Sequence, residues 1–514
     1  MSQQLQAFAI TAPGFYGLNT QDSSLDLASG FALTATNCVI DQYGRVGARK
    51  GWEAQHSSSG ALGTNYITTI GEVITADGTS YTVCAGNAKL FILSGGSLTQ
   101  LTYGGGGVTP LLTDGNWSVA SLNGKLYLFQ EGYDPLVFDP DTSTTTYRRV
   151  SEMSSYSGTV QHSNVVIAAY GRLWNASSDV DKVTIQWSDI LSGNKWSGGS
   201  SGSLNTESVW PKGGDTIVGL GAHNGYLFIF GKNNILIYNN ATDPSAMSLQ
   251  DTVSGIGCVS RDSIAYTGTD ILFLSTTGLR SIQRTIQEKS APFSDLSKNV
   301  RNDLVGYVLG ETDTTIKGVY SPKDAFYLLS LQTSNITYCF DMKGKLQDGS
   351  SRVTVWENLV PRAAYTKADG TLLVGMAGYV GAYSGYTDNN DTYRMTYYTN
   401  HTDLGRPIIS IIPKKMIAYV VGGSDQDLIM KWAYDFTGAF ESQITTLPAQ
   451  SVAYYGESEY NYGYEYSAGQ VLNVLTAYPT GSGKVIQLGF ETDVYGFAVS
   501  IQKLEIHAKE GKIY

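Results

Sequence analysis

A tight turn followed by a short apolar run recurs along most of this chain at nearly constant spacing. Its clearest copy begins at Asn123-Gly124, a dipeptide that accepts positive φ at both central positions of a hairpin turn. Leu126–Phe129 follows as an apolar and aromatic run of strand length, too short to favour a helix. A second strand is expected at Pro135–Asp139, and the proline at its start places it near a sheet edge. The stretch therefore predicts a β-hairpin.

The same turn is found seven times. The first residues of the seven turns are Asp77, Asn123, Tyr170, Asn224, Thr269, Lys323 and Asp369. They are separated by 46, 47, 54, 45, 54 and 46 residues, close to the roughly 40–50 residues of a four-stranded propeller blade. Downstream strands are expected to repeat as well, as at Gly278–Arg284. A β-rich chain with 58 glycines would also alternate turns and strands by chance, but near-constant spacing over seven copies favours a true repeat. We therefore predict an all-β fold with a β-propeller of six or seven blades over residues 61–390.

The two ends of the chain do not follow the repeat. Residues 1–60 are predicted to be an N-terminal arm with one hairpin, formed by Ala35–Ile40 and Arg45–Arg49. Residues 391–514 contain longer alternating runs such as Thr392–Thr402 and Val499–Ala508. Runs of this kind predict a C-terminal antiparallel β platform or sandwich domain.

The composition agrees with a β-rich structural protein. Charged residues make up 15% of the chain, against about 25% in average proteins, and there are 35 tyrosines, which suit strands and interfaces. The net charge of −11 disfavours a nucleic-acid grip, which needs clustered cations to displace counterions. The four cysteines are widely spaced and are expected to be buried free thiols from a reducing compartment. The N-terminus lacks a basic and apolar leader pattern, so synthesis in the cytosol is expected.

Motifs that would carry chemistry are incomplete. Tyr478–Val485 (YPTGSGKV) lacks the first glycine of a phosphate loop and has valine after its lysine. Gly219–Gly225 (GLGAHNG) opens a hairpin instead of the helix that a dinucleotide site needs. Asp388–Thr392 and Asp139–Ser143 cluster side-chain oxygens without continuing as calcium loops, so each is expected to be a solvated turn. The five histidines show no metal-ligand spacing. We therefore expect no catalytic, cofactor-binding or metal-binding residue, no cofactor, and a protein that is not an enzyme.

The segment Gly17–Glu53 carries a recognisable pattern. It begins with Gly-Leu-Asn-Thr and continues through an Asp-Leu step to an Asn–strand–Asp-x-x-Gly-Arg–strand–Arg-x-Gly-Trp unit. The pattern is formed by Gly17, Leu18, Asn19, Asp26, Asn37, Asp41, Gly44, Arg45, Arg49, Gly51 and Trp52. It resembles the opening of the nozzle proteins of short-tailed bacteriophages, also called tail tubular protein B or tail hub proteins. The late segments LGFETD and SIQKLEIHAKEGKIY are similar to the closing part of the same family, so the resemblance touches both ends of the chain.

This resemblance implies a structural virion protein. A nozzle forms a homo-oligomeric ring, a hexamer by family resemblance, below the portal and its adaptor, where it continues the DNA channel, retains packaged DNA and anchors fibres or spikes. The implied partners are further copies of the chain, the tail adaptor or portal-proximal protein, a tail fibre, spike or needle protein, and the host envelope. Viral DNA would pass through without specific binding. The implied location is the virion tail, after synthesis in the bacterial cytoplasm.

A function of another class remains open. A carbohydrate-binding or glycoside-cleaving β-propeller could be built on the same repeat, because glycosidic acid–base chemistry needs only two suitably separated carboxylates. Asp-box repeats or a secretion signal would favour this alternative, and the sequence shows neither.

The stretch Tyr454–Tyr466 reads YYGESEYNYGYEY and contains no basic residue. Its tyrosines are the candidate interface or channel residues, namely Tyr454, Tyr455, Tyr460, Tyr462, Tyr464 and Tyr466. Tyrosine combines a large contact area with few rotatable bonds and a hydroxyl group, which suits protein interfaces. Two interpretations stand, an exposed mobile loop or a subunit-contact or channel-exit loop that becomes ordered in a ring.

Deletion of Glu457–Glu465 separates these two interpretations. For a contact or channel-exit loop, we expect the deleted chain to remain folded but to assemble poorly, or to give particles that leak DNA. Circular dichroism would check folding, and electron microscopy and DNA retention would check assembly. Normal rings with normal retention would leave the stretch as an exposed loop.

Overall fold

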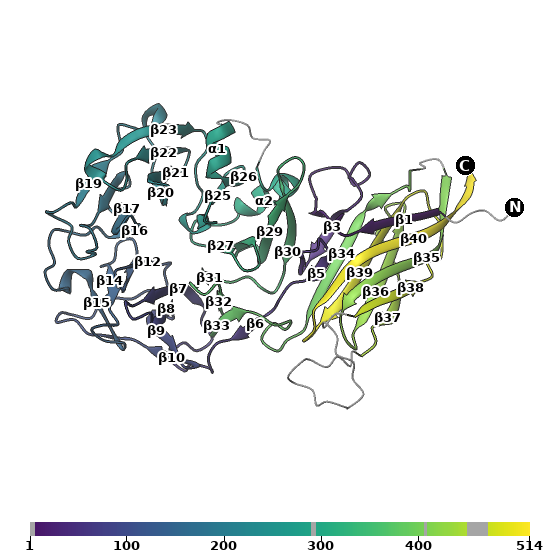
Figure 1. The fold of residues 1–514 in the computed structure, drawn as a ribbon, viewed down its shortest axis with the longest axis horizontal. Coiled ribbons are helices and arrows are strands. Elements are labelled where there is room, and N and C mark those ends of the chain that lie inside the picture. Colours follow the sequence, from purple (N-terminus) through teal and green to yellow (C-terminus); the bar gives the residue numbers. More distant parts are fainter. Residues whose placement is uncertain (1–5, 289–294, 406–408, 450–470, 514) are drawn as a thin grey trace.

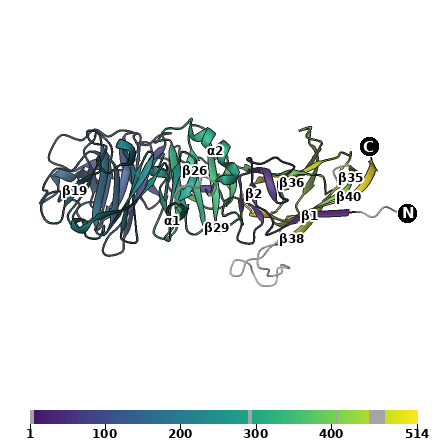
Figure 2. The ribbon, with the colours of Figure 1, turned by 90° about the horizontal axis from the view of Figure 1, so that it is seen from above.

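The computed structural model describes residues 6–288, 295–405, 409–449 and 471–513. Within these ranges the chain is an all-β protein in two parts, a ring of small sheets and a β-sandwich beside it (Figure 1). The ring is a seven-bladed propeller, so the predicted all-β propeller is confirmed. The sandwich contains the predicted C-terminal strands together with strands from the predicted N-terminal arm. Seen from above, the sandwich lies beside the propeller and extends it lengthwise (Figure 2).

The seven blades follow one another along the chain. Blade one consists of β7 (Ile67–Ile74), β8 (Ser80–Gly86), β9 (Lys89–Ser94) and β10 (Ser97–Gln100). Blade two consists of β12 (Ser118–Leu122), β13 (Lys125–Phe129), β14 (Leu136–Phe138) and β15 (Thr146–Arg149), with β11 (Thr102–Tyr103) added. Blade three consists of β16 (Ser163–Ala169), β17 (Arg172–Ser178), β18 (Thr184–Trp187) and β19 (Gly202–Asn205). Blade four consists of β20 (Ile217–His223), β21 (Tyr226–Gly231), β22 (Asn234–Asn239) and β23 (Ser248–Ser254). Blade five consists of β24 (Ala265–Tyr266), β25 (Ile271–Ser275) and β26 (Gly278–Ser281). Blade six consists of β27 (Ile316–Ser321), β28 (Phe326–Leu331), β29 (Ile336–Lys345) and β30 (Ser351–Trp356). Blade seven is β31 (Ala363–Thr366), β32 (Leu372–Met376), β33 (Tyr379–Tyr383) and β6 (Trp52–Ala54).

Each of the seven predicted turns lies between the first and second strand of one blade. At Asn123-Gly124 both residues have positive φ, 49° and 70°, and at Asn224-Gly225 the values are 49° and 81°. This backbone matches the twist of a two-residue hairpin, which explains why asparagine and glycine stand there. The regular spacing of the turns therefore reflects one turn per blade.

Blade seven is closed by a strand from the N-terminal segment. β6 pairs with β33 in antiparallel register, with Trp52 opposite Tyr383 and Ala54 opposite Gly381. The first strands of blades one and seven, β7 and β31, also contact each other, as do those of most neighbouring blades. The propeller is therefore a closed ring to which residues from the predicted N-terminal arm contribute a strand.

Two local expectations were wrong. The strand at Pro135–Asp139 does not lie at an edge, because β14 is fully buried between β13 and β15. Pro135 stands just before this strand, where its missing N–H costs no ladder bond, and its carbonyl accepts from Val150 at 2.8 Å. The strand expected at Gly278–Arg284 stops at Ser281, and helix α1 (Ile282–Glu288) follows; a second helix, α2 (Arg301–Val308), precedes blade six.

The sandwich is made of two facing sheets. One consists of β1 (Gln6–Thr11), β4 (Cys38–Ile40), β5 (Val46–Ala48), β35 (Ile409–Gly422), β38 (Leu472–Ala477) and β40 (Val499–Ile513), and the other of β3 (Phe31–Thr36), β34 (Tyr393–Thr402), β36 (Asp427–Tyr434), β37 (Glu441–Thr446) and β39 (Ile486–Val494). Alternating side chains from both sheets meet in one core, as Met416 and Ile506 from the first sheet and Met430 and Phe490 from the second illustrate. This burial is the main stabilising contribution to the domain.

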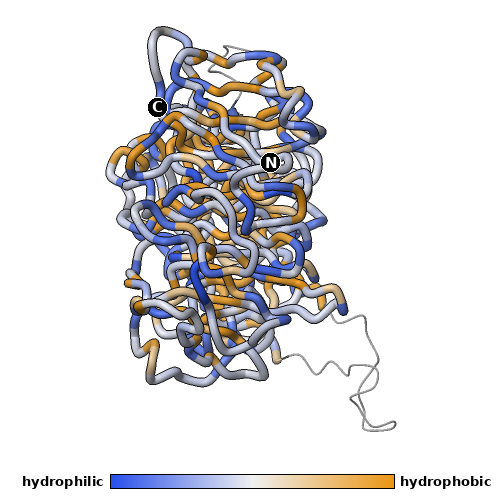
Figure 3. Tube along the Cα trace, turned by 90° about the vertical axis from the view of Figure 1, so that its left-hand side faces the viewer, coloured by the Kyte–Doolittle hydropathy of each residue, from blue (hydrophilic) through white to orange (hydrophobic). Residues whose placement is uncertain are grey.

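The second sandwich sheet is continuous with blade six. The outer strand β30 pairs in parallel with β2 (Gly17–Leu18) and with β3, so one ten-stranded sheet runs from β27 to β37. Apolar and hydrophilic stretches alternate along the coloured part of the trace (Figure 3), as expected for strands with one buried face. The four cysteines are buried free thiols, as predicted.

The closure of the ring can be tested at Trp52, which is 8% exposed. Its ring lies so close to Gly381 that a Cβ there would come within 2.4 Å of it. Trp52→Ala should lower the free energy of unfolding by about 3–5 kcal/mol, because a large buried side chain is lost from the closing strand. Urea unfolding followed by fluorescence would measure the change. Tyr495→Ala, which truncates a 58% exposed ring, is the control; equal effects of the two variants would contradict a stabilising role for the closure.

Candidate functional site

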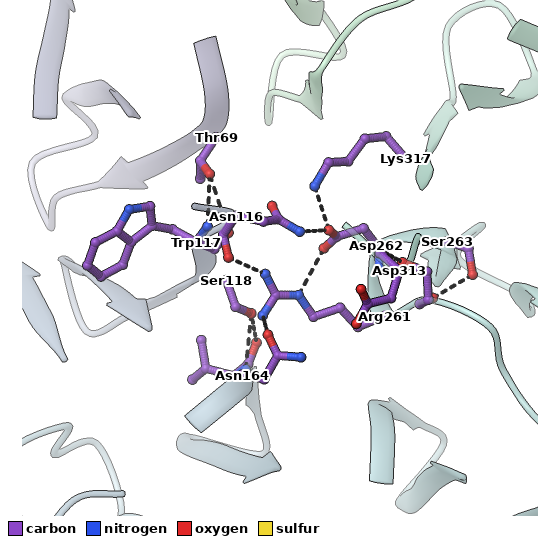
Figure 4. A network of polar contacts seen from close by, with 12 residues as sticks. Thr69, Asn116, Trp117, Ser118, Asn164, Arg261, Asp262, Ser263, Asp313 and Lys317 are labelled. Carbon is purple, nitrogen blue, oxygen red and sulfur yellow. Dashed lines mark hydrogen bonds and ion pairs between the residues drawn. The ribbon is translucent and has the colours of Figure 1, made fainter. Parts of the chain in front are cut away.

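The middle of the propeller is occupied by a polar network (Figure 4). Its centre is a short 3-10 turn, η4 (Arg261–Ser263), in front of the two-residue strand β24. This turn contacts β20 and β27, the first strands of the two neighbouring blades, so it replaces the missing length of strand in blade five.

Arg261 joins three blades. Its guanidinium donates to the Asn164 side chain at 2.6 Å and to the Asn116 backbone carbonyl at 2.6 Å, and its Nε donates to Asp262 at 3.2 Å. Asn164 belongs to β16 of blade three, and Asn116 precedes β12 of blade two. The Arg261 side chain is 6% exposed, so its charge is stabilised almost entirely by protein groups and hardly by water.

Asp262 is the anion of the network. Lys317 of β27 donates to it at 2.6 Å, and the Asn116 amide also donates to it. Burial alone would raise the pKa of Asp262, but the charges on Lys317 and Arg261 outweigh burial and lower the pKa to about 2. Burial lowers the pKa of Lys317, an effect that the carboxylate of Asp262 opposes. The carboxylate therefore stays ionised and has little tendency to act as a general acid near neutral pH.

Hydrogen bonds between first strands continue the network around the ring. The Thr69 hydroxyl of β7 accepts from the Trp117 N–H at 3.3 Å. The Ser118 hydroxyl of β12 donates to the Val166 carbonyl at 3.3 Å and accepts from the Val166 N–H at 3.1 Å. Side chains thus tie adjacent blades together where no backbone ladder does.

Cavities lie beside this network. One of about 510 Å³ is lined by Arg261, Asn164, Lys232 and Thr216, among others, and one of about 380 Å³ lies on the Asp262–Lys317 side. In the first, Glu131 is paired with Lys182 at 2.5 Å. The Glu131 carboxylate beside the first cavity and the Asp262 carboxylate beside the second are thus each paired with a cation.

A second network joins the propeller to the sandwich. The fully buried Arg49 donates to both oxygens of Asp388, at 2.7 and 2.6 Å, and to the Asn37 side-chain oxygen at 3.0 Å. Its two remaining donors bond the carbonyls of Lys50 and Glu357, so all five N–H groups of the guanidinium have acceptors. The guanidinium also lies 4.0 Å from the ring centre of Tyr393 in β34.

The sequence motifs take ordinary structural places. Asp388, expected to lie in a solvated turn, is instead the buried partner of Arg49, while Gly219–Gly225 lies in β20 and its turn. Tyr454, Tyr455, Tyr460, Tyr462, Tyr464 and Tyr466 fall outside the described residues. No group of three or more potential metal ligands occurs in the part of the chain that the structure describes. Within that same part, no helix has the length and apolarity needed to cross a bilayer.

Comparison with known proteins gives similarities of fold. No protein-family model and no curated protein matches the chain. Among solved structures, YCF48 from Cyanidioschyzon merolae is 11% identical with a TM-score of 0.38, covering 65% of this chain and 98% of its own. The Neurospora crassa Pan2 WD40 domain (9% identity, TM-score 0.38, 66% and 95% covered) and the WD40 domain of Toxoplasma gondii coronin (10%, 0.35, 65% and 83%) are also similar. Similarities this weak carry no argument about function.

The Asp262 carboxylate should make stability depend on pH in acid. Its pKa is lowered in the folded state, so the ionised form stabilises the fold above about pH 4, and this contribution, on the order of 2 kcal/mol, is lost as the pH falls towards 2. Asp262→Asn should destabilise the protein at neutral pH and remove this part of the acid dependence. Chemical unfolding between pH 7 and 2.5 would measure both effects. The exposed Asp141→Asn is the control; an unchanged acid slope in Asp262→Asn would contradict the assignment.

Proposed function

We propose that this chain is a structural virion protein, the nozzle of a short phage tail. It forms a ring below the portal and adaptor, a hexamer by family resemblance, continues the DNA channel, retains packaged DNA and anchors fibres or spikes. Its partners are further copies of itself, the adjoining tail protein, and a fibre, spike or needle protein. The chain binds no cofactor in this role and catalyses no reaction.

The observation that carries the proposal is the position of the family-like unit. Its residues shape the joint between propeller and sandwich instead of a surface loop. Asn37, with φ of 53°, accepts from Arg49 and from the Glu357 N–H at 3.0 Å each. Gly51 approaches Thr387 so closely that a Cβ would lie 1.8 Å from its carbonyl oxygen. A motif located at this joint fits a protein whose two parts must keep a fixed relation.

Other matching residues build the turn that leads into the joint. The Asp41 carboxylate accepts from the N–H groups of Tyr43 at 2.8 Å and Arg45 at 2.9 Å, and from the Arg45 side chain at 2.6 Å. Gly44 has φ of 73° in this turn, which disfavours any side chain. Nearly the whole pattern therefore has structural tasks, as expected of a scaffold.

The electrostatics support passage of DNA without a grip. The chain carries a net charge of −11. Tight DNA binding requires cations free to neutralise phosphates. A weak interaction suits a channel from which DNA must leave quickly.

Electron microscopy of the purified chain, alone and with the preceding tail protein, tests the proposal. We expect rings, with the adjoining tail protein seated on one face, and weak DNA retention in a filter assay at physiological salt. Ring-free monomers under both conditions would contradict it. If such monomers bound a polysaccharide, the carbohydrate-binding or glycoside-cleaving alternative would replace it.

A further inference from the structure

Within the described residues, one sheet of the sandwich has an outer strand without a neighbour on each of two opposite sides. The sheet has the order β38-β35-β40-β5-β4, and β1 (Gln6–Thr11) pairs with the later part of β40, on the same side as β5. Along that part of β40 the outer strands are β1 and, across β35, β38 (Leu472–Ala477), which lie on opposite sides of the sandwich (Figure 1). Among the described residues, no strand pairs with the outer side of either one. Their outward backbone N–H and C=O groups form two open ladders.

Neither strand carries the usual protection of an edge. Soluble proteins place lysine, proline or other charges on exposed edges to prevent pairing with another chain. β1 reads QAFAIT and β38 reads LNVLTA, with no charged residue and no proline. On β38, Leu472 is 55% exposed and Val474 is 53% exposed. Two unprotected edges on one sheet indicate that both are covered when the protein functions.

The directions of the two strands fit each other. β1 runs antiparallel to β40, whereas β38, antiparallel to β35, runs the same way as β40. β1 and β38 are therefore antiparallel to each other, and each is six residues long. A rotation about an axis along the strands keeps these directions, so β38 of one copy would meet β1 of the next as an antiparallel pair.

The side chains on the shared face are also complementary. Across the sheet, Val474 lies opposite Tyr419, Tyr419 lies opposite Lys503, and Lys503 lies opposite Thr11. Side chains in one such row point to the same face of the sheet. That face therefore carries Leu472, Val474 and Thr476 of β38 and Ala7, Ala9 and Thr11 of β1. Large residues on one edge would thus meet small ones on the other. Such cross-strand neighbours, about 4.5–5.5 Å apart, contribute to sheet stability.

We propose that copies of this chain assemble head to tail by pairing β38 of one copy with β1 of the next. Each copy then covers one edge with β38 and one with β1, and repeated rotation closes the sheets into a ring. A two-fold pairing of β38 with β38 would leave both β1 edges open, so it satisfies half of the exposed ladders. A place for this sheet in the channel wall rests on the proposed function. The pairing of β38 with β1 does not depend on that function.

Cysteine cross-linking tests the pairing directly. The native cysteines are buried, and burial raises the pKa of each thiol, so they should not react. Val474→Cys would be combined in turn with Ala7→Cys and Ala9→Cys, because disulfides need neighbouring Cβ atoms. We expect one double variant to give a ladder of covalent oligomers on a non-reducing gel, and each single variant to give none. Dimers from Val474→Cys alone would overturn the head-to-tail arrangement in favour of a two-fold contact.

Charge substitution gives a second test on the full chain. Leu472→Lys with Val474→Lys should raise the concentration needed for half assembly at least tenfold, as measured by light scattering. Adding Ala7→Glu and Ala9→Glu should restore assembly by placing carboxylates opposite the lysines. The matched control is Val108→Lys with Val180→Lys, which changes two residues 85% and 87% exposed on the propeller. Unchanged assembly in the edge variant would overturn the proposal.

The two proposals fail separately. Rings seen by microscopy without edge cross-links would overturn the edge pairing and leave the nozzle function standing. Cross-linked rings that do not bind the adjoining tail protein would support the pairing and count against the nozzle function. If the chain without edge substitutions stayed monomeric at every concentration tested, the edge pairing would be overturned outright.

Discussion

The ion pair between Arg49 and Asp388 holds the two parts of the molecule in one arrangement. Arg49 is fully buried and has an acceptor for every donor. Removing such charges from water is costly, and the cost is recovered only when geometry and hydrogen bonding are complete. The acceptors come from both sides of the joint, with Asn37 leading out of β3 in the sandwich and Glu357 following β30 in the propeller. Any shift between the two parts would break several of these bonds at once.

The ring depends on the same segment of chain. Three residues after Arg49, Trp52 opens the strand that completes blade seven. Just before it, Val46–Ala48 pairs with the sandwich strand β40. One segment of about ten residues thus supplies a strand to the sandwich and a strand to the propeller. Closure of the propeller and assembly of the sandwich therefore both depend on this segment. This coupling explains why the most patterned part of the sequence is neither a blade nor a sandwich strand of ordinary length.

Local signals made most of the propeller predictable. Asn-Gly and Asp-Gly turns require φ values that few residues accept, so their spacing marks the blades even without long-range information. The strands that cross between parts had no such signal. Trp52–Ala54 is three residues long, and its partner lies more than 300 residues later in the sequence. A pairing so distant leaves no local period to detect, and the N-terminal arm therefore looked irregular.

The polar sites were predictable to a lesser degree. Arg261-Asp262 has the appearance of an exposed turn, and Lys317 is a single cation in an otherwise ordinary strand. They meet because the first strand of blade five is only two residues long. In the sequence, this short strand is indicated only by a short run of apolar residues. Asp388, grouped with Asn389 and Asn390, looked like a solvated oxygen cluster, and nothing local indicated a buried arginine. Ion pairs between distant segments are fixed by topology, which must be known first.

The continuous sheet from β27 to β37 gives these local contacts a mechanical consequence. Ten strands run from the inner strand of blade six to the outer edge of the sandwich as one hydrogen-bonded sheet. Force applied to the sandwich would load backbone hydrogen bonds of β30, β2 and β3 and the buried Arg49–Asp388 pair together. Linked domains usually move relative to each other unless their interface is large and apolar; here a shared ladder and a saturated ion pair provide the restraint. If the sandwich is held in a ring of copies, its position therefore also determines the position of the propeller. The orientation of the propeller then decides which of its surfaces a second protein can reach.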